Sequence, residues 1–78
     1  MGEALLVDIR ERLAYNLRRL RHAKGLSQEQ FAFDVDIHRA YVSDLERAAR
    51  NPTILVIEKL AKGLGVAEGE LFQALPPK

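Results

Sequence analysis

The sequence predicts an all-α fold, with one domain over residues 1–78 built from five helices. Apolar residues recur at intervals of three and four along residues 6–20, the spacing of one helix face. Ser27 and Thr53 each precede a new apolar segment, where a helix N-cap is expected. With 47% hydrophobic residues, the 78-residue chain can fill one small core.

The first expected helix covers residues 3–24. Its apolar face consists of Leu6, Ile9, Leu13, Leu17 and Leu20. Gly25 can take the left-handed conformation that ends many helices, and Lys24 suits the negative end of the helix dipole.

Residues 27–47 predict two short helices joined by a tight bend near Asp36. Ser27 and Gln30 have the spacing of a capping box. The two apolar stripes consist of Phe31, Ala32 and Val35, and of Ile37, Val42 and Leu45. Helices with so short a link cross steeply, as in a helix-turn-helix, whose second helix can enter the major groove of DNA.

Two further helices are expected over residues 53–63 and 68–74. Residues 54–57 are all apolar and span about 300° around a helix, so a small domain cannot bury all of them. We expect surplus apolar residues here to form a homodimer interface. Its predicted members are Leu55, Val56, Leu71, Phe72 and Leu75. The alternative is that some of them are simply exposed on a monomer.

Composition narrows the functional classes. The chain has no cysteine, which excludes disulfides and thiolate metal sites and fits a reducing cytosol. No apolar run approaches the roughly 18 residues of a membrane span, and no signal peptide is recognisable, so we expect a cytoplasmic protein without a membrane partner. His22 and His38 are the only histidines. Because these two histidines belong to no catalytic or metal-binding motif, we expect no enzyme activity, no metal and no cofactor.

The charge distribution is more informative than the net charge of +1. Residues 10–50 contain nine Lys and Arg against six Asp and Glu, so the positive excess lies beside the predicted helix pair. A positive surface of this kind suits nucleic acid. The alternative is that these charges only solvate helix faces.

Three segments carry a resemblance to a known family: IRERLAYNLRRLRHAKGLSQEQFA (9–32), IHRAYVSDLERAARNPT (37–53) and IEKLAKGLGV (57–66). In order and spacing they resemble the lambda-repressor-like, Cro/CI or XRE family of helix-turn-helix regulators. The resemblance covers residues 12–73 and leaves residues 1–11 as an N-terminal extension of the first helix. Residues 38–51 are especially similar to the controller proteins of restriction-modification systems. The resemblance implies a five-helix domain that binds operator DNA as a dimer and regulates transcription.

The resemblance also implies an internal ion pair between Arg21 and Glu46 that fixes the recognition helix. Some positions differ from the family pattern. Asp36 and Ala48 stand where glycine is usual. We therefore expect Asp36 to adopt the left-handed conformation and the recognition helix to continue past Ala48. His38 and Ala67 stand where capping residues are usual, which predicts weaker helix starts.

A recognition helix in the major groove would direct one face towards the bases. The predicted base contacts are Arg39, Ala40, Ser43 and Asp44. Arg39 is the best candidate for bidentate bonding to guanine. Asp44 has three open roles: accepting from a cytosine amino group, orienting Arg39 or Arg47, or repelling the DNA backbone.

Flanking residues are expected to contact phosphate or sugar, which positions a domain without reading sequence. The predicted backbone contacts are Gln28, Tyr41, Arg47, Arg50 and Asn51. For Arg47 and Arg50, ordinary solvated surface is the alternative.

These observations together predict a sequence-specific transcriptional regulator. We expect a homodimer on double-stranded DNA, at an inverted repeat whose half-sites lie about one helical turn apart. An autoregulatory controller of a restriction-modification system is the narrower hypothesis, and RNA polymerase is a further candidate partner. The alternative is a small helical protein-interaction module, such as an antitoxin or adaptor.

Overall fold

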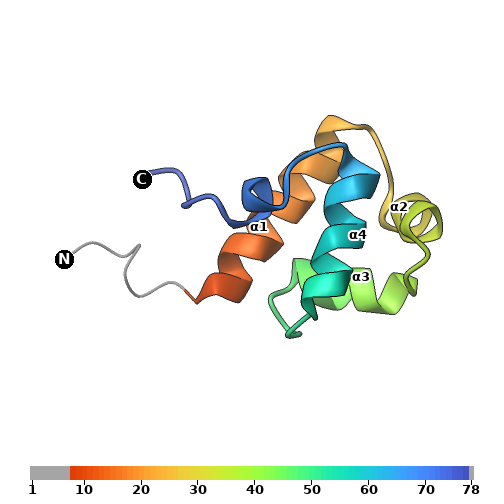
Figure 1. The fold of residues 1–78 in the computed structure, drawn as a ribbon, viewed down its shortest axis with the longest axis horizontal. Coiled ribbons are helices and arrows are strands. Elements are labelled where there is room, and N and C mark those ends of the chain that lie inside the picture. Colours follow the sequence, from red (N-terminus) through yellow and green to blue (C-terminus); the bar gives the residue numbers. More distant parts are fainter. Residues whose placement is uncertain (1–7, 78) are drawn as a thin grey trace.

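The computed structural model describes residues 8–77, which form four α-helices and one short 3-10 helix without any strand (Figure 1). The elements are α1 (Ile9–Ala23), α2 (Gln28–Val35), α3 (Arg39–Glu46), α4 (Ile54–Leu64) and the 3-10 helix η2 (Glu68–Phe72). The prediction of an all-α fold is confirmed. The further short helix expected over residues 68–74 is present as a 3-10 helix that ends two residues earlier, at Phe72, so the described residues contain four α-helices and not five. Ala67 provides no side-chain cap, which agrees with the weak start expected there.

The first helix begins later than predicted. Asp8 is a non-helical N-cap whose carboxylate accepts a hydrogen bond from the Arg10 amide at 2.7 Å, so α1 starts at Ile9. The predicted extension over residues 3–7 lies outside the described residues. Ile9, assigned to the apolar face, is 53% exposed. At the other end, Gly25 takes the expected left-handed conformation with φ +71°.

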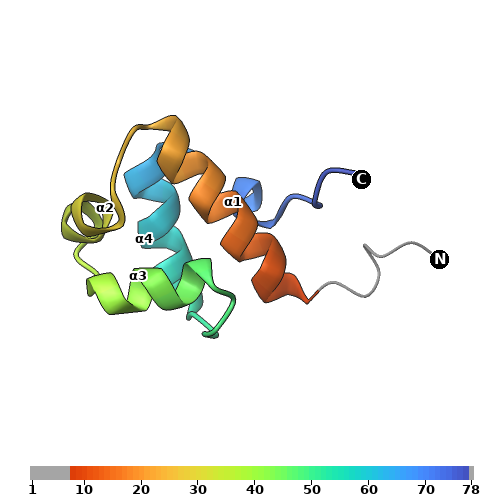
Figure 2. The ribbon, with the colours of Figure 1, turned by 180° about the vertical axis from the view of Figure 1, so that it is seen from behind.

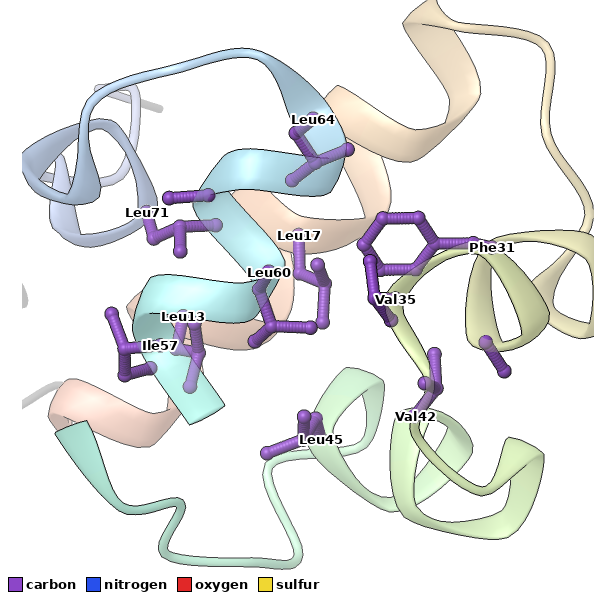
Figure 3. Close-up of a cluster of buried hydrophobic side chains, with 12 residues drawn as sticks. Leu13, Leu17, Phe31, Val35, Val42, Leu45, Ile57, Leu60, Leu64 and Leu71 are labelled. Carbon is purple, nitrogen blue, oxygen red and sulfur yellow. The ribbon is translucent and has the colours of Figure 1, made fainter. Parts of the chain in front are cut away.

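One hydrophobic core joins all five elements (Figure 3). Leu17 of α1, Phe31 of α2, Val42 of α3, Leu60 of α4 and Leu71 of η2 are each fully buried. The apolar stripes predicted from the sequence therefore converge behind the helix-turn-helix and support it.

The turn of the helix-turn-helix is built by local side-chain and backbone preferences. Ser27 caps α2 by accepting a hydrogen bond from the Gln30 amide at 3.0 Å. The reciprocal bond, in which the Ser27 amide would donate to the Gln30 side-chain oxygen, is not formed within residues 8–77. Asp36 ends α2 in the left-handed region with φ 56°, as expected, and its amide bonds back to the last turn. His38 begins α3 without a side-chain cap, which also agrees with expectation.

The expected continuation of α3 is wrong. The helix ends at Glu46, and Ala48 takes φ 59°, a conformation that glycine would occupy without strain. The Ala49 amide then bonds to the carbonyl of Asp44 at 2.9 Å, which closes the helix end. The chain therefore turns at this position even though it lacks the glycine.

Asn16 attaches the C-terminal segment to α1. Its buried side-chain amide donates to the carbonyls of Arg12, Leu71 and Gln73 at 2.9–3.2 Å. The segment lies beside α1 in both ribbon views (Figures 1 and 2). No periodic pattern along the chain predicts this polar anchor.

Candidate nucleic-acid interface

Helix α3 lies along one edge of the molecule with one side on the core and the other open (Figure 2). Val42 and Leu45 are buried, as predicted. Arg39 and Ala40 are exposed, and Ser43 and Asp44 are half-buried. All four predicted base-contacting residues therefore lie on α3 outside its buried stripe, accessible from one side.

Arg39 is the most available cation of this helix. It occupies the first position of α3, and within residues 8–77 its side chain forms no ion pair or hydrogen bond. An unpaired guanidinium keeps all five of its donors for an outside partner. This geometry permits the bidentate contact predicted from the sequence.

Asp44 lies between two other predicted contact residues. Its carboxylate accepts from Arg50 at 3.0 Å and from Arg47, whereas Arg39 is not its partner. The Arg50 guanidinium also stacks over the Tyr41 ring, 4.4 Å from the centroid. The hydrogen bonds from Arg50 and then Arg47 lower the pKa of Asp44, so the carboxylate stays charged at neutral pH.

Behind this face, Arg21 and Glu46 meet in a buried ion pair. The guanidinium donates to both carboxylate oxygens, at 2.7 and 2.9 Å, and their side chains are 8% and 3% exposed. A third bond, from Arg21 to the carbonyl of Leu26, joins the pair to the loop before α2. The bonds to Glu46 raise the pKa of Arg21. The pair links α1 to the last residue of α3 and so fixes the angle of the recognition helix.

Gln28 has a different partner from the predicted phosphate. Its side-chain amide donates to Glu46 at 2.9 Å, which places it on the buried pair at the start of α2. Asn51 is exposed in the loop after α3, and its side chain bonds to no other residue within 8–77. Contact of either residue with DNA stays a prediction.

The predicted dimer residues do not share one environment. Leu55 is 69% exposed, and its neighbour Ile54 is 85% exposed. Val56, Phe72 and Leu75 are half-buried. Leu71 is wrong as an interface residue, because it is completely buried in the core of the single chain.

Two features of this surface were not predicted from the sequence. Phe33 of α2 is 86% exposed, and the only available signal was its position off the stripe of Phe31, Ala32 and Val35. The stacking of Arg50 on Tyr41 was also missed, because the two residues are joined by a loop whose path the sequence does not specify.

The geometry defines a class: a helix-turn-helix protein whose second helix is presented for contact with a groove. A family model described as Helix-turn-helix (HTH_3) matches residues 17–71. The chain therefore belongs to the helix-turn-helix family. It is 43% identical over 66 residues to Control protein C.BamHI of Bacillus amyloliquefaciens, covering 83% of this chain and 82% of the relative.

Solved structures agree with this assignment. The restriction-modification controller protein C.AhdI from Aeromonas hydrophila is 44% identical with a TM-score of 0.78, covering 81% of this chain and 96% of that one. The controller protein C.Esp1396I, solved as a tetramer in complex with its natural 35 base-pair operator, is 32% identical with a TM-score of 0.76, covering 85% of this chain and 87% of that one.

Proposed function

We propose that this protein is a sequence-specific, DNA-binding transcriptional regulator that acts as a homodimer on an inverted-repeat operator. The observation that carries the proposal is the presentation of α3: its first residue, Arg39, is exposed and has no side-chain partner within residues 8–77, and the Arg21–Glu46 ion pair holds the helix from the buried side. Such a helix fits the major groove, where arginine distinguishes guanine from other bases. The named relatives are control proteins and transcriptional regulators, which supports a regulator and not an enzyme.

The narrower proposal is a controller of a restriction-modification system that regulates its own promoter. Similarity to several controller proteins over most of the chain supports it. Within residues 8–77 no helix is long and apolar enough to cross a membrane. We place the protein in the cytoplasm, where its DNA would be. RNA polymerase is a proposed second partner, supported by the apolar Phe33 that α2 leaves exposed.

The test is selection of duplexes from a randomised pool, followed by gel shifts of the selected duplex over a series of salt concentrations. Arg39→Glu should weaken binding by at least about tenfold, because a base contact of 1–3 kcal/mol is lost and repulsion is added. Arg18→Glu, the same charge reversal at an exposed position of α1, is the matched control. Equal affinity of the folded Arg39→Glu variant and the parent would contradict the proposal.

A protein-interaction module is the second candidate, favoured by the exposed apolar residues Phe33, Ile54 and Leu55. The same selection of duplexes from a randomised pool distinguishes the regulator from the protein-interaction module. A module without DNA affinity would enrich no sequence, whereas a regulator would enrich an inverted repeat and lose affinity steeply with salt.

A further inference from the structure

We propose that Asp44 is a positioning residue that orients Arg50, and with it Arg47, for contact with DNA, and does not itself read a base. The inference rests on the proposed function. Of the three roles left open for Asp44 it is nearest to the orientation of Arg39 or Arg47, but the main partner of Asp44 is Arg50, which the sequence did not indicate. The inference is carried by a cluster of four side chains on α3 and the loop that follows it: Tyr41, Asp44, Arg47 and Arg50.

The cluster holds the Arg50 guanidinium on two sides. One terminal nitrogen donates to Asp44 at 3.0 Å, and the group stacks on Tyr41 at 4.4 Å from the ring centroid. Arg50 belongs to the loop after α3, whereas Tyr41 and Asp44 belong to the helix itself. The two contacts therefore attach a loop residue to the rigid recognition helix.

The arrangement leaves Arg50 able to bind a further partner. Its other two nitrogens form no hydrogen bond within residues 8–77, and its side chain remains 45% exposed. Arg47, which shares the same carboxylate, is 65% exposed. A guanidinium that already has one fixed rotamer loses less conformational entropy on binding. Its affinity is therefore higher for a DNA group that lies where this rotamer can reach it.

The same contacts disfavour direct base reading by Asp44. Each of its two carboxylate oxygens accepts a hydrogen bond from an arginine, and the Asp44 side chain is only 25% exposed. To accept from a cytosine amino group, the carboxylate would have to share or release one of these bonds. The lowered pKa of Asp44 agrees with a carboxylate whose charge is used by the two arginines.

The test is a double-mutant cycle on the full chain with Asp44→Ala, Arg50→Ala and the double variant. The probes are the duplex that the wild-type protein selects from a randomised pool and a duplex of random sequence. Asp44→Ala should weaken binding to the selected duplex by about tenfold, a usual size for coupled neighbours. The loss on the random duplex should be smaller, because phosphate contacts by Arg47 and Arg50 there do not depend on one fixed geometry and a negative charge beside phosphates has gone.

Coupling is the readout that a merely structural role would not change. If Asp44 acts through Arg50, Arg50→Ala should cost much less affinity in the Asp44→Ala background than in the wild type. Asp44→Asn, which keeps one acceptor oxygen, should recover part of the loss. Asp34→Ala removes an exposed carboxylate of α2 that forms no ion pair with any residue of 8–77; it controls for net charge and should reproduce none of the coupling.

Three results would overturn the inference while leaving the regulator intact. These are independent effects of Asp44→Ala and Arg50→Ala, tighter binding of Asp44→Ala to the selected duplex, or a loss of discrimination at one base pair without coupling to Arg50. If the wild-type protein selects no duplex at all, the proposed function fails first, and the role of Asp44 fails with it.

Discussion

Glu46 is the most constrained residue beside the proposed interface. It is 3% exposed and accepts from both Arg21 and Gln28, so one carboxylate joins α1, α2 and α3. A charge in this position is stabilising only while its partners remain, because an unpaired buried charge loses its hydration without compensation. The pair thus makes the position of the recognition helix depend on two side chains.

Replacing Glu46 with alanine should lower the free energy of unfolding by about 3–5 kcal/mol, because the Arg21 guanidinium is left buried without its counter-charge. Urea denaturation at neutral pH measures the change, and DNA affinity should fall with it. Glu58→Ala on α4, an exposed carboxylate, is the control. The double variant Arg21→Met/Glu46→Leu should recover much of the stability, and an unchanged midpoint for Glu46→Ala would show that the pair is not structural.

Asp8 makes the start of α1 sensitive to acid. Hydrogen bonds from the side chain and amide of Arg10 lower the pKa of Asp8 to about 2. Because the pKa is lower in the folded state, the stabilising effect is complete above the unfolded value, about 3.9, and is lost as the pH falls towards the folded value.

Asp8→Asn should therefore flatten the fall in stability of the folded protein between about pH 4 and pH 2, because asparagine caps a helix without titrating there. Thermal denaturation at a series of pH values measures this. Asp34→Asn, at an exposed carboxylate without an ion pair in the described part of the chain, should keep the wild-type profile in that window. A profile of Asp8→Asn that parallels the wild type would show that the carboxylate contributes nothing on ionisation.

At the scale of elements, the end of α3 shows a conflict between local preference and tertiary packing. Ala48 holds a left-handed conformation that costs a non-glycine residue about 1–2 kcal/mol. The turn persists because Leu45 is buried on one side and the Ala49 amide is bonded to Asp44 on the other. Tertiary packing therefore ends α3 at a position where the local sequence has no helix-terminating residue.

Ala48→Gly should raise the free energy of unfolding by about 1 kcal/mol. The change relieves the strain of the left-handed conformation, and part of this gain is offset because glycine has more conformational entropy in the unfolded chain. Ala49→Gly, at a neighbouring residue with negative φ, should lower it by about 0.5 kcal/mol for the entropic reason alone. Urea denaturation of both variants gives the comparison. Equal changes in the two would contradict the strain at Ala48.

The helices with clear periodicity could be predicted from the sequence, and the features that depend on distant contacts could not. The caps Ser27 and Thr53 and the left-handed Asp36 follow from local chemistry, so they were predictable. The burial of Leu71 was not, because it depends on η2 folding back onto α1 through the bonds of Asn16. On the interface, the position of Arg39 followed from the helix face, whereas the pairing of Asp44 with Arg50 required the path of the loop.

At the scale of the whole molecule, one copy presents one recognition helix and leaves an apolar surface on α4. A single helix reads too few base pairs to select an operator, whereas a two-fold dimer would place two helices about 34 Å apart on one face of the duplex. Ile54 and Leu55 are large apolar residues that the core leaves exposed side by side. We therefore place the proposed dimer contact there.

Leu55→Glu should convert the dimer to a monomer, because two carboxylates would be brought together in an apolar contact. Sedimentation equilibrium measures the mass, and affinity for the selected duplex should fall because each domain then binds only one half-site. Phe33→Glu is the matched control, since it places the same charge at an equally apolar and exposed residue on α2. If Phe33→Glu dissociates the dimer and Leu55→Glu does not, the copies meet through α2, and the assignment of the contact to α4 is wrong.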